Sequence, residues 1–127
     1  MNRENLQKLA DFIKTVPQEI FDMEDIRTGQ TEDAKCDSVG CVIGHATALY
    51  DGELPRRAIT GSIDFSAFWQ EFGGLHYLDS CWIVCASWTQ VDNTPLGASK
   101  RIEWLLKNGR PENWNEQMNG NAPLCYN

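Results

Sequence analysis

The chain has 127 residues, of which 42% are hydrophobic, and it carries a formal net charge of −7 with a pI of about 4.7. This length is typical of one domain that buries about two thirds of its unfolded surface. The acidic charge argues against direct binding to nucleic-acid backbones, which need concentrated lysine and arginine. No apolar run approaches the length of a membrane span, and no basic and apolar leader is present, so we expect a soluble, cytoplasmic protein. Five cysteines without a tight framework fit reduced thiols in that compartment.

Helical periodicity begins near the start of the chain and stops at Pro17. The apolar residues recur at three- and four-residue steps, as on one face of a helix: Leu6, Leu9, Ala10, Phe12, Ile13 and Val16. Proline lacks the N–H group that a helix interior needs. We therefore expect a first amphipathic helix that Pro17 closes.

Acidic side chains are concentrated in residues 19–37. This segment holds seven acidic residues against Arg27 and Lys35, and so carries −5 of the net charge. A solvated loop is the ordinary interpretation of such a run. The alternative is an acidic surface that docks on a basic groove of a partner. The residues expected to form such a partner-binding surface are Glu24, Asp25, Glu32 and Asp33.

A second helix is expected after Cys36, in the stretch around which the rest of the chain is organised. Asp37 or Ser38 can accept hydrogen bonds from the free N–H groups of its first turn. The apolar residues that follow keep helical spacing: Val39, Val42, Ile43, Ala46, Leu49 and Tyr50. We expect this helix to end near Gly52 and to be buried at the centre of the fold.

A third helix is predicted before the pair Gly73 and Gly74, which stop it. Ser62 or Asp64 is its candidate N-cap. Aromatic residues occupy positions i, i+3, i+4 and i+7 of this helix: Phe65, Phe68, Trp69 and Phe72. A stripe with this spacing is typical of a helix face in the core.

Residues 78–88 are compatible with two structures. Leu78, Trp82 and Cys85 fit a buried helix that is capped by Asp79 or Ser80, whereas residues 81–85 alone resemble a buried strand. We favour the helix, because no second strand is predicted that could pair with a first one.

The last helix has the clearest boundaries. Thr94 is its predicted N-cap and Pro95 occupies the first helical position, where its missing N–H costs nothing. Gly109 ends the helix and Pro111 prevents its continuation. The residues expected on the buried side are Ala98, Ile102, Leu105 and Leu106.

Together these patterns predict an all-α fold, a single compact bundle of about five short helices with an irregular C-terminal tail. We expect residues 1–111 to form the helical domain. Residues 112–127 are rich in asparagine and are expected to dock on this domain or to extend from it.

Short motifs also carry a resemblance that spans residues 4–111. Residues 36–46 are similar to a C-G-T-x-x-C-x-x-G-(H or W)-A motif of small uncharacterised proteins of tailed phages and prophages, with Asp37 in place of glycine. Those proteins also share a Phe-Asp-Met-like segment and an Arg-Ile-x-x-Leu-Leu-x-x-Gly-x-Pro helix, which correspond to residues 21–23 and 101–111 here. The resemblance implies a phage or prophage origin and an intracellular helical domain, and it implies no activity.

Two kinds of chemistry are conceivable in the central stretch. The candidate metal ligands are Cys36, Cys41 and His45, with a fourth from Cys81, Cys85 or His76. Their spacing is looser than the tight cysteine pairs of structural zinc sites, which argues against bound zinc. Cys41 and His45 are also the candidate catalytic residues, as a thiol near a helix N-terminus and its base. No oxyanion or orienting motif accompanies them, and a buried structural cysteine is commoner.

A third hypothesis is the sequestration of a small ligand between helices. The aromatic residues that would line such a pocket are Phe68, Trp69, Trp82 and Trp88. The basic residues that would meet an anionic group of the ligand are Arg56, Arg57 and Lys100. Since no catalytic motif is recognisable, we favour a binding role over an enzyme. The sequence thus predicts a small acidic phage-type accessory protein that engages or inhibits a host macromolecule, expected to be a protein, in the host cytoplasm.

Overall fold

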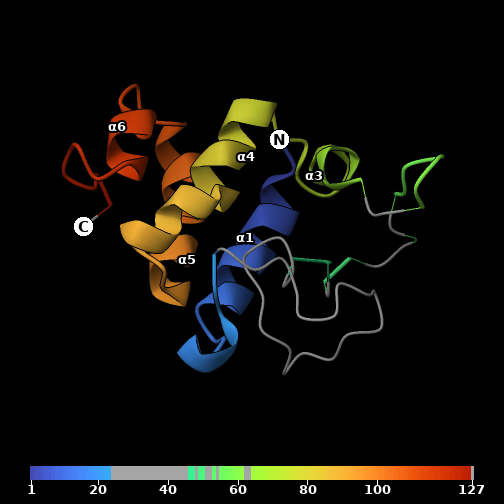
Figure 1. Ribbon diagram of the computed structural model, residues 1–127, viewed down its shortest axis with the longest axis horizontal. Helices are drawn as coiled ribbons and strands as arrows, with labels where there is room; N and C mark the ends of the chain where they lie inside the picture. The colour runs from blue at the N-terminus through green and yellow to red at the C-terminus, as the bar shows by residue number, and fades with distance from the viewer. Residues whose placement is uncertain (24–45, 48, 51–52, 54, 62–63, 127) are drawn as a thin grey trace.

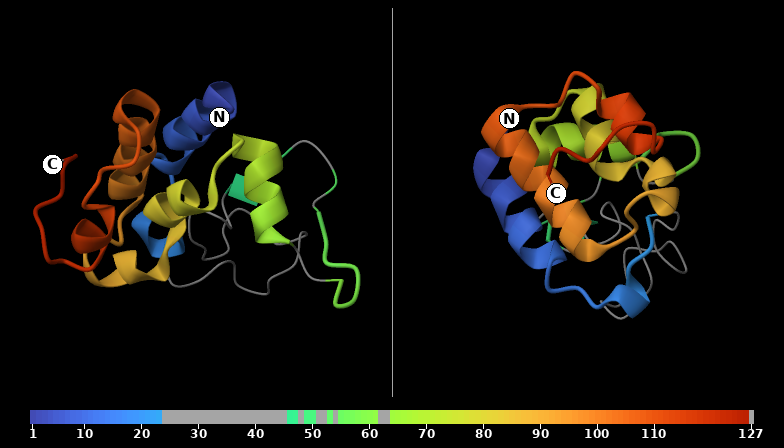
Figure 2. Two further views of the ribbon diagram at one scale, coloured as in Figure 1. Left: turned by 90° about the horizontal axis from the view of Figure 1, so that it is seen from above. Right: turned by 90° about the vertical axis from the view of Figure 1, so that its left-hand side faces the viewer.

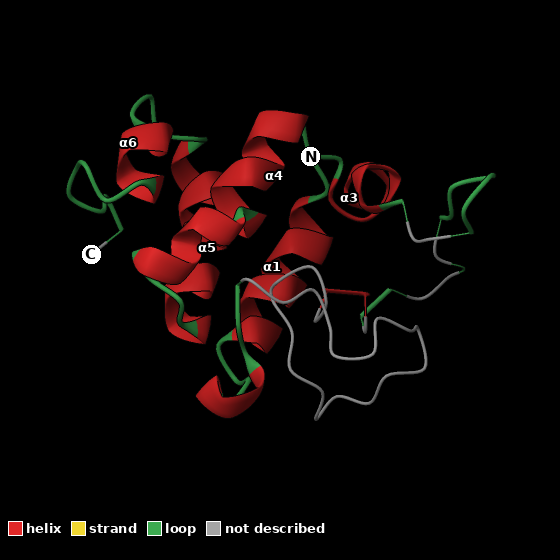
Figure 3. Cartoon of the chain, in the orientation of Figure 1, coloured by secondary structure: helices red, strands yellow, loops and turns green. Residues whose placement is uncertain are grey.

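The computed structural model describes residues 1–23, 46–47, 49–50, 53, 55–61 and 64–126. The α-helices in these ranges are α1 (Arg3–Ile13), α3 (Phe65–Gly73), α4 (Tyr77–Val84), α5 (Pro95–Asn108) and α6 (Trp114–Met118), and the 3₁₀ helices are η1 (Gln18–Ile20) and η2 (Ala86–Gln90). The described residues contain no β-strand (Figure 3), so the predicted all-α fold is confirmed. None of these helices has both the length and the apolar character of a bilayer-spanning segment.

The helices are arranged around α1 and α5. Figures 1 and 2 show α3 on one side of this pair, with residues 55–61 further out, and α6 with the C-terminal residues on the other side. Helix α1 makes its main contact with α5, and α4 packs on α5 as well. A buried hydrogen bond joins the central pair, because the Ser99 hydroxyl on α5 donates to the Ala10 carbonyl oxygen on α1 at 2.7 Å.

Helix α1 begins at a side-chain cap and ends earlier than predicted. The Asn2 side chain accepts a hydrogen bond from the Asn5 N–H at 3.0 Å. After Ile13 the N–H groups of Thr15 and Val16 bond to carbonyls three residues back, so the chain tightens into a turn before the proline. The predicted apolar face is confirmed by the buried residues Leu6, Leu9, Ala10 and Ile13.

Helix α3 has the boundaries that its caps predict. Of the two candidate N-caps, Asp64 caps the helix by accepting from the Ala67 N–H at 3.1 Å. Gly74 ends it with a φ of 59°, a left-handed conformation that glycine adopts without steric cost. The aromatic stripe is core, as predicted, with Phe68, Trp69 and Phe72 buried and Phe65 packed against them.

Residues 78–84 are α-helical, as favoured, and residues 86–88 belong to η2, but the cap differs from the prediction. Helix α4 begins at Tyr77, and His76 is its N-cap, with Nδ1 accepting from the Leu78 N–H at 3.2 Å. The prediction that Asp79 or Ser80 caps this helix is wrong, because both lie inside its first turn. The backbone then becomes extended at Cys85, with a ψ of 137°, before η2 begins.

The break between α4 and η2 places two tryptophans in the core. On a continuous helix, side chains six residues apart point about 120° away from each other. The break lets both Trp82 and Trp88 become fully buried. Their rings meet edge to face with centroids 5.3 Å apart, and the Trp88 indole N–H donates to the Trp82 carbonyl oxygen at 3.0 Å.

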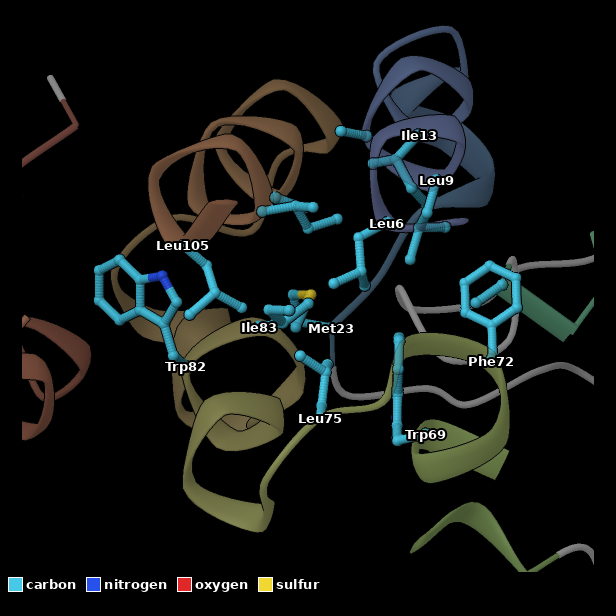
Figure 4. Packing of buried hydrophobic residues seen from close by; sticks show 14 of the residues in the cluster. Leu6, Leu9, Ile13, Met23, Trp69, Phe72, Leu75, Trp82, Ile83 and Leu105 are labelled. Atoms are coloured by element: carbon cyan, nitrogen blue, oxygen red, sulfur yellow. The ribbon is translucent and has the colours of Figure 1, made fainter. Parts of the chain in front are cut away.

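Helix α5 follows the sequence signals at both ends. The Thr94 side chain accepts from the Gly97 N–H at 3.0 Å, Pro95 is the first helical residue, and Gly109 follows the last turn. The buried apolar side predicted for this helix, Ala98, Ile102, Leu105 and Leu106, is confirmed. Figure 4 shows Leu105 in the core with Ile83 of α4 and Leu6 of α1.

The segment predicted to be irregular contains the short helix α6. Five residues span less than two turns, so α6 leaves no periodic pattern in the sequence. Gln117 and Met118 are buried, and the Gln117 Oε1 atom accepts from the Cys125 N–H at 2.9 Å. The partly buried side chains of this segment that pack against the core are Trp114, Leu124, Cys125 and Tyr126.

Only the end of the predicted second helix lies among the described residues. Ala46 and Thr47 are helical and Ala46 is fully buried. Tyr50 meets Phe68 edge to face, with ring centroids 5.4 Å apart. The predicted cap of that helix, Asp37 or Ser38, and its glycines, Gly40 and Gly44, lie outside the described residues.

Candidate functional site

The central metal and catalytic candidates and the predicted acidic surface lie outside the residues that the structure describes. Outside the described residues lie the candidate metal and catalytic residues Cys36, Cys41 and His45 and the acidic residues Glu24, Asp25, Glu32 and Asp33. The hypotheses on these residues therefore stay predictions.

The described residues on both sides of that stretch are anchored in the core. Met23 is buried, and its N–H donates to the Asn93 Oδ1 atom at 2.7 Å. The Asn93 Nδ2 atom donates in turn to Asp22 Oδ1 at 3.2 Å. Ala46, at the other side, is fully buried. Residues 24–45 thus connect two buried positions.

The candidates for a fourth metal ligand, His76, Cys81 and Cys85, are all described. His76 Nδ1 already accepts a backbone hydrogen bond as a helix cap. Cys81 and Cys85 are free and partly buried, and the Cys85 thiol lies 3.5 Å from the Ser87 hydroxyl. In the ranges that the structure describes, no three His, Cys, Asp or Glu side chains gather as metal ligands would.

The four aromatic residues proposed as the lining of a ligand pocket are core residues instead. All four are at most 3% exposed: Phe68, Trp69, Trp82 and Trp88. Phe68 stacks on Phe72 at 5.3 Å and meets Trp69 at 5.4 Å, so these rings fill the space between them. A pocket between these four side chains, as the sequence suggested, is therefore not formed.

A buried arginine, which the sequence analysis did not single out, organises the C-terminal half. Arg101 is fully buried on the inner side of α5. Its guanidinium lies 4.1 Å from the centre of the Trp88 ring, and its Nη1 atom donates to the Tyr126 hydroxyl at 3.0 Å. The same Nη1 atom lies 3.8 Å from Asp92 Oδ2. The sequence signal was an arginine three residues after Ala98, within the apolar stripe of α5.

Tyr126 and Asp92 complete this network. The Tyr126 hydroxyl donates to Asp92 Oδ2 at 2.8 Å, while Asp92 Oδ1 accepts from the Thr94 hydroxyl at 2.6 Å. Burial raises the pKa of Tyr126 above its usual range, against the opposing effect of the Arg101 charge. Tyr126 is therefore protonated at neutral pH and acts as the donor to Asp92.

One polar atom of the network has no hydrogen-bond partner in the part of the chain that the structure describes, and a glycine packs against the Asp92 carboxylate. Among the described residues, Arg101 Nε has no hydrogen-bond acceptor. Burial lowers the pKa of Arg101, whereas Tyr126 and Asp92 oppose this shift. Gly97 is required because a Cβ atom there would overlap the Asp92 carboxylate. These contacts join η2, α5 and the C-terminal residues into one unit.

A groove lies on the outer side of the same unit, which we call the α5–tail groove. It has a volume of about 390 Å³, and its described lining comprises Lys100, Glu103, Trp104, Lys107, Asn108, Cys125 and Tyr126. The five residues from α5 recur at i, i+3, i+4, i+7 and i+8, so they share one helix face. Cys125 and Tyr126 form the opposite wall.

Burial raises the pKa of the Cys125 thiol, which makes it a poor nucleophile at neutral pH.

The groove contains an unusual pair of cations for so acidic a chain. Lys100 is partly buried and Lys107 is exposed. Neither has an ion-pair partner among the described residues, whereas Lys8 and Lys14 on α1 pair with Glu4 and Asp11.

Comparison of the chain with protein-family models, with curated proteins and with solved structures finds no match.

Proposed function

We propose that this chain is an accessory protein of a phage or prophage that acts by binding and that engages or inhibits a host protein. The observation that carries the proposal is the concentration of −5 of the net charge of −7 within residues 19–37. Clustered charge of one sign steers association with a partner of opposite charge and selects against other partners. The expected partner therefore presents a basic surface, and interference with host defence is one role that such binding serves.

The anchoring of the flanking residues supports this proposal. Residues 24–45 carry the four acidic side chains assigned to the partner, and the described residues that flank this segment, Met23 and Ala46, are both buried. The Asn93 side chain holds the Met23 backbone at 2.7 Å. A binding segment whose two ends are held loses less conformational freedom on binding than one that is free at one end.

The test is an affinity capture of the tagged protein from bacterial lysate, at low and high salt. One variant reverses the charges of the predicted surface: Glu24, Asp25, Glu32 and Asp33 to lysine. A matched control reverses four exposed acidic residues elsewhere: Asp11, Glu53, Glu112 and Glu116 to lysine. Both variants have the same net charge, so any difference between them reports position and not total charge.

We expect a stoichiometric host protein to bind the wild-type chain and the control variant but not the surface variant. High salt should release it, because ionic contacts at a surface are screened over about 8–10 Å at physiological salt and less far at higher salt. Equal capture by both variants, or by neither, would count against the acidic surface. Circular dichroism checks the fold, and both variants should remain as helical as the wild-type chain.

A further inference from the structure

We propose that the α5–tail groove is a second binding site, independent of the acidic segment, and that it takes a small organic anion with a planar aromatic ring, of the nucleoside phosphate class. The groove brings together Trp104 and Tyr126 with two lysines. Its volume of about 390 Å³ lies within the range of small-molecule sites, about 300–1,000 Å³.

The spacing along α5 matches such a ligand. Trp104 lies between Lys100 and Lys107, which are two helical turns apart, or about 10 Å along the axis. A flat ring can stack on the indole of Trp104, because every nucleobase offers a π-face. The anionic group of the ligand then reaches the ammonium group of either lysine, on one side of the ring or the other.

The charges of the groove favour an anion that also carries hydrogen-bonding groups. Neither Lys100 nor Lys107 is neutralised by an ion pair among the described residues, so both remain available to a ligand. Glu103 lies on the same helix face and leaves the described lining with a small positive excess. Its carboxylate and the Asn108 amide can hydrogen-bond the amino or hydroxyl groups of a nucleoside. A bare polyanion has no donor for the Glu103 carboxylate and is repelled by its charge.

The wall opposite α5 is held in place before any ligand arrives. Tyr126 is tied to Arg101 at 3.0 Å and to Asp92 at 2.8 Å. The backbone of Cys125 is tied to Gln117 at 2.9 Å. A preformed wall lowers the conformational cost of binding. Tyr126, which belongs to both, thus links the buried Arg101 network to the outer groove.

The test follows the indole N–H resonance of Trp104 by NMR while ATP is added without metal ions. The variant Trp104→Phe assigns the resonance. We expect a saturable shift with a dissociation constant below about 1 mM, and weaker binding of adenosine or of inorganic triphosphate alone. The double variant Lys100→Gln/Lys107→Gln should weaken ATP binding at least about tenfold, because it removes both cations.

The matched control is Lys8→Gln/Lys14→Gln, which removes two exposed lysines of α1 that already have partners. It should bind ATP as the wild-type chain does. Three results would overturn the proposal: no shift of the Trp104 resonance at about 5 mM ATP, equal weakening in both double variants, or triphosphate binding as tightly as ATP. Because none of these variants touches residues 24–45, failure here would leave the acidic-surface proposal standing.

Discussion

Replacing Tyr126 with phenylalanine tests whether the buried Arg101 network stabilises the fold. The substitution keeps the ring that packs against Trp82 and Trp88 and removes only the hydroxyl. That hydroxyl makes two hydrogen bonds with charged groups, to Asp92 at 2.8 Å and from Arg101 at 3.0 Å. A hydrogen bond with a charged group contributes about 1.5–3 kcal/mol.

The full sum of two such bonds overstates the loss, because other partners remain. Arg101 Nη1 keeps the Asp92 carbonyl oxygen at 3.4 Å, and Asp92 keeps the Thr94 hydroxyl at 2.6 Å. Water can also reach the edge of Tyr126 that lines the groove. We therefore expect the free energy of unfolding to fall by about 2–3 kcal/mol. For a domain of this size the melting temperature should fall by about 8–12 °C.

Tyr50→Phe is the matched control. The Tyr50 hydroxyl also donates to a carboxylate at 2.8 Å, that of Glu71, but this contact is exposed to solvent. Its removal should cost no more than about 0.5 kcal/mol, because water replaces the lost bond. Urea unfolding followed by tryptophan fluorescence, together with thermal unfolding by circular dichroism, measures both variants. Equal losses in the two variants, or a loss below about 1 kcal/mol for Tyr126→Phe, would refute the role assigned to the buried network.

Three further predictions concern the same region and the central stretch. The folded-state pKa of Tyr126 is raised, so the stability that this tyrosine contributes is complete below its ordinary pKa of about 10 and is lost as the pH rises above it. The urea midpoint of Tyr126→Phe should therefore fall less steeply with rising pH than that of the wild-type chain. Gly97→Ala should lower the free energy of unfolding by about 1–3 kcal/mol through overlap with Asp92, although alanine favours helices, and a gain would contradict this. Elemental analysis should find no stoichiometric zinc, whereas one zinc per chain would establish the metal hypothesis for the central stretch. Cys41 should react with thiol reagents with an ordinary pH profile, near a pKa of about 8.5. A strongly lowered pKa of this thiol would instead establish the nucleophile hypothesis.

Local signals explain which helices could be predicted. Asp64 and Thr94 are N-caps that act on N–H groups three residues away, and Gly74 and Gly109 end their helices through their own backbone. The aromatic stripe of α3 and the apolar stripe of α5 also depend only on spacing within one helix. Such features are encoded within a few residues, so they can be recognised without any knowledge of the neighbouring elements.

Features that depend on distant partners were missed or misjudged. His76 caps α4 although histidine is not among the preferred N-caps, and the break at Cys85 follows from the need to bury both Trp82 and Trp88. The tryptophans suggested as a ligand site are core because they belong to one buried cluster, to which α1, α3, α4 and α5 all contribute.

The sequence by itself determined the helical class, the boundaries of α3 and α5 and the acidic character of this protein, because periodicity, capping and charge are local properties. Only the tertiary structure decided that Arg101 is fully buried with its charge balanced by Asp92, and that Tyr126, 25 residues further along the chain, completes the network. The α5–tail groove likewise forms only in the tertiary structure, because its lining comes both from α5 and from Cys125 and Tyr126. A buried charge is tolerated where folding supplies its partners, and those partners come from segments that no local pattern connects.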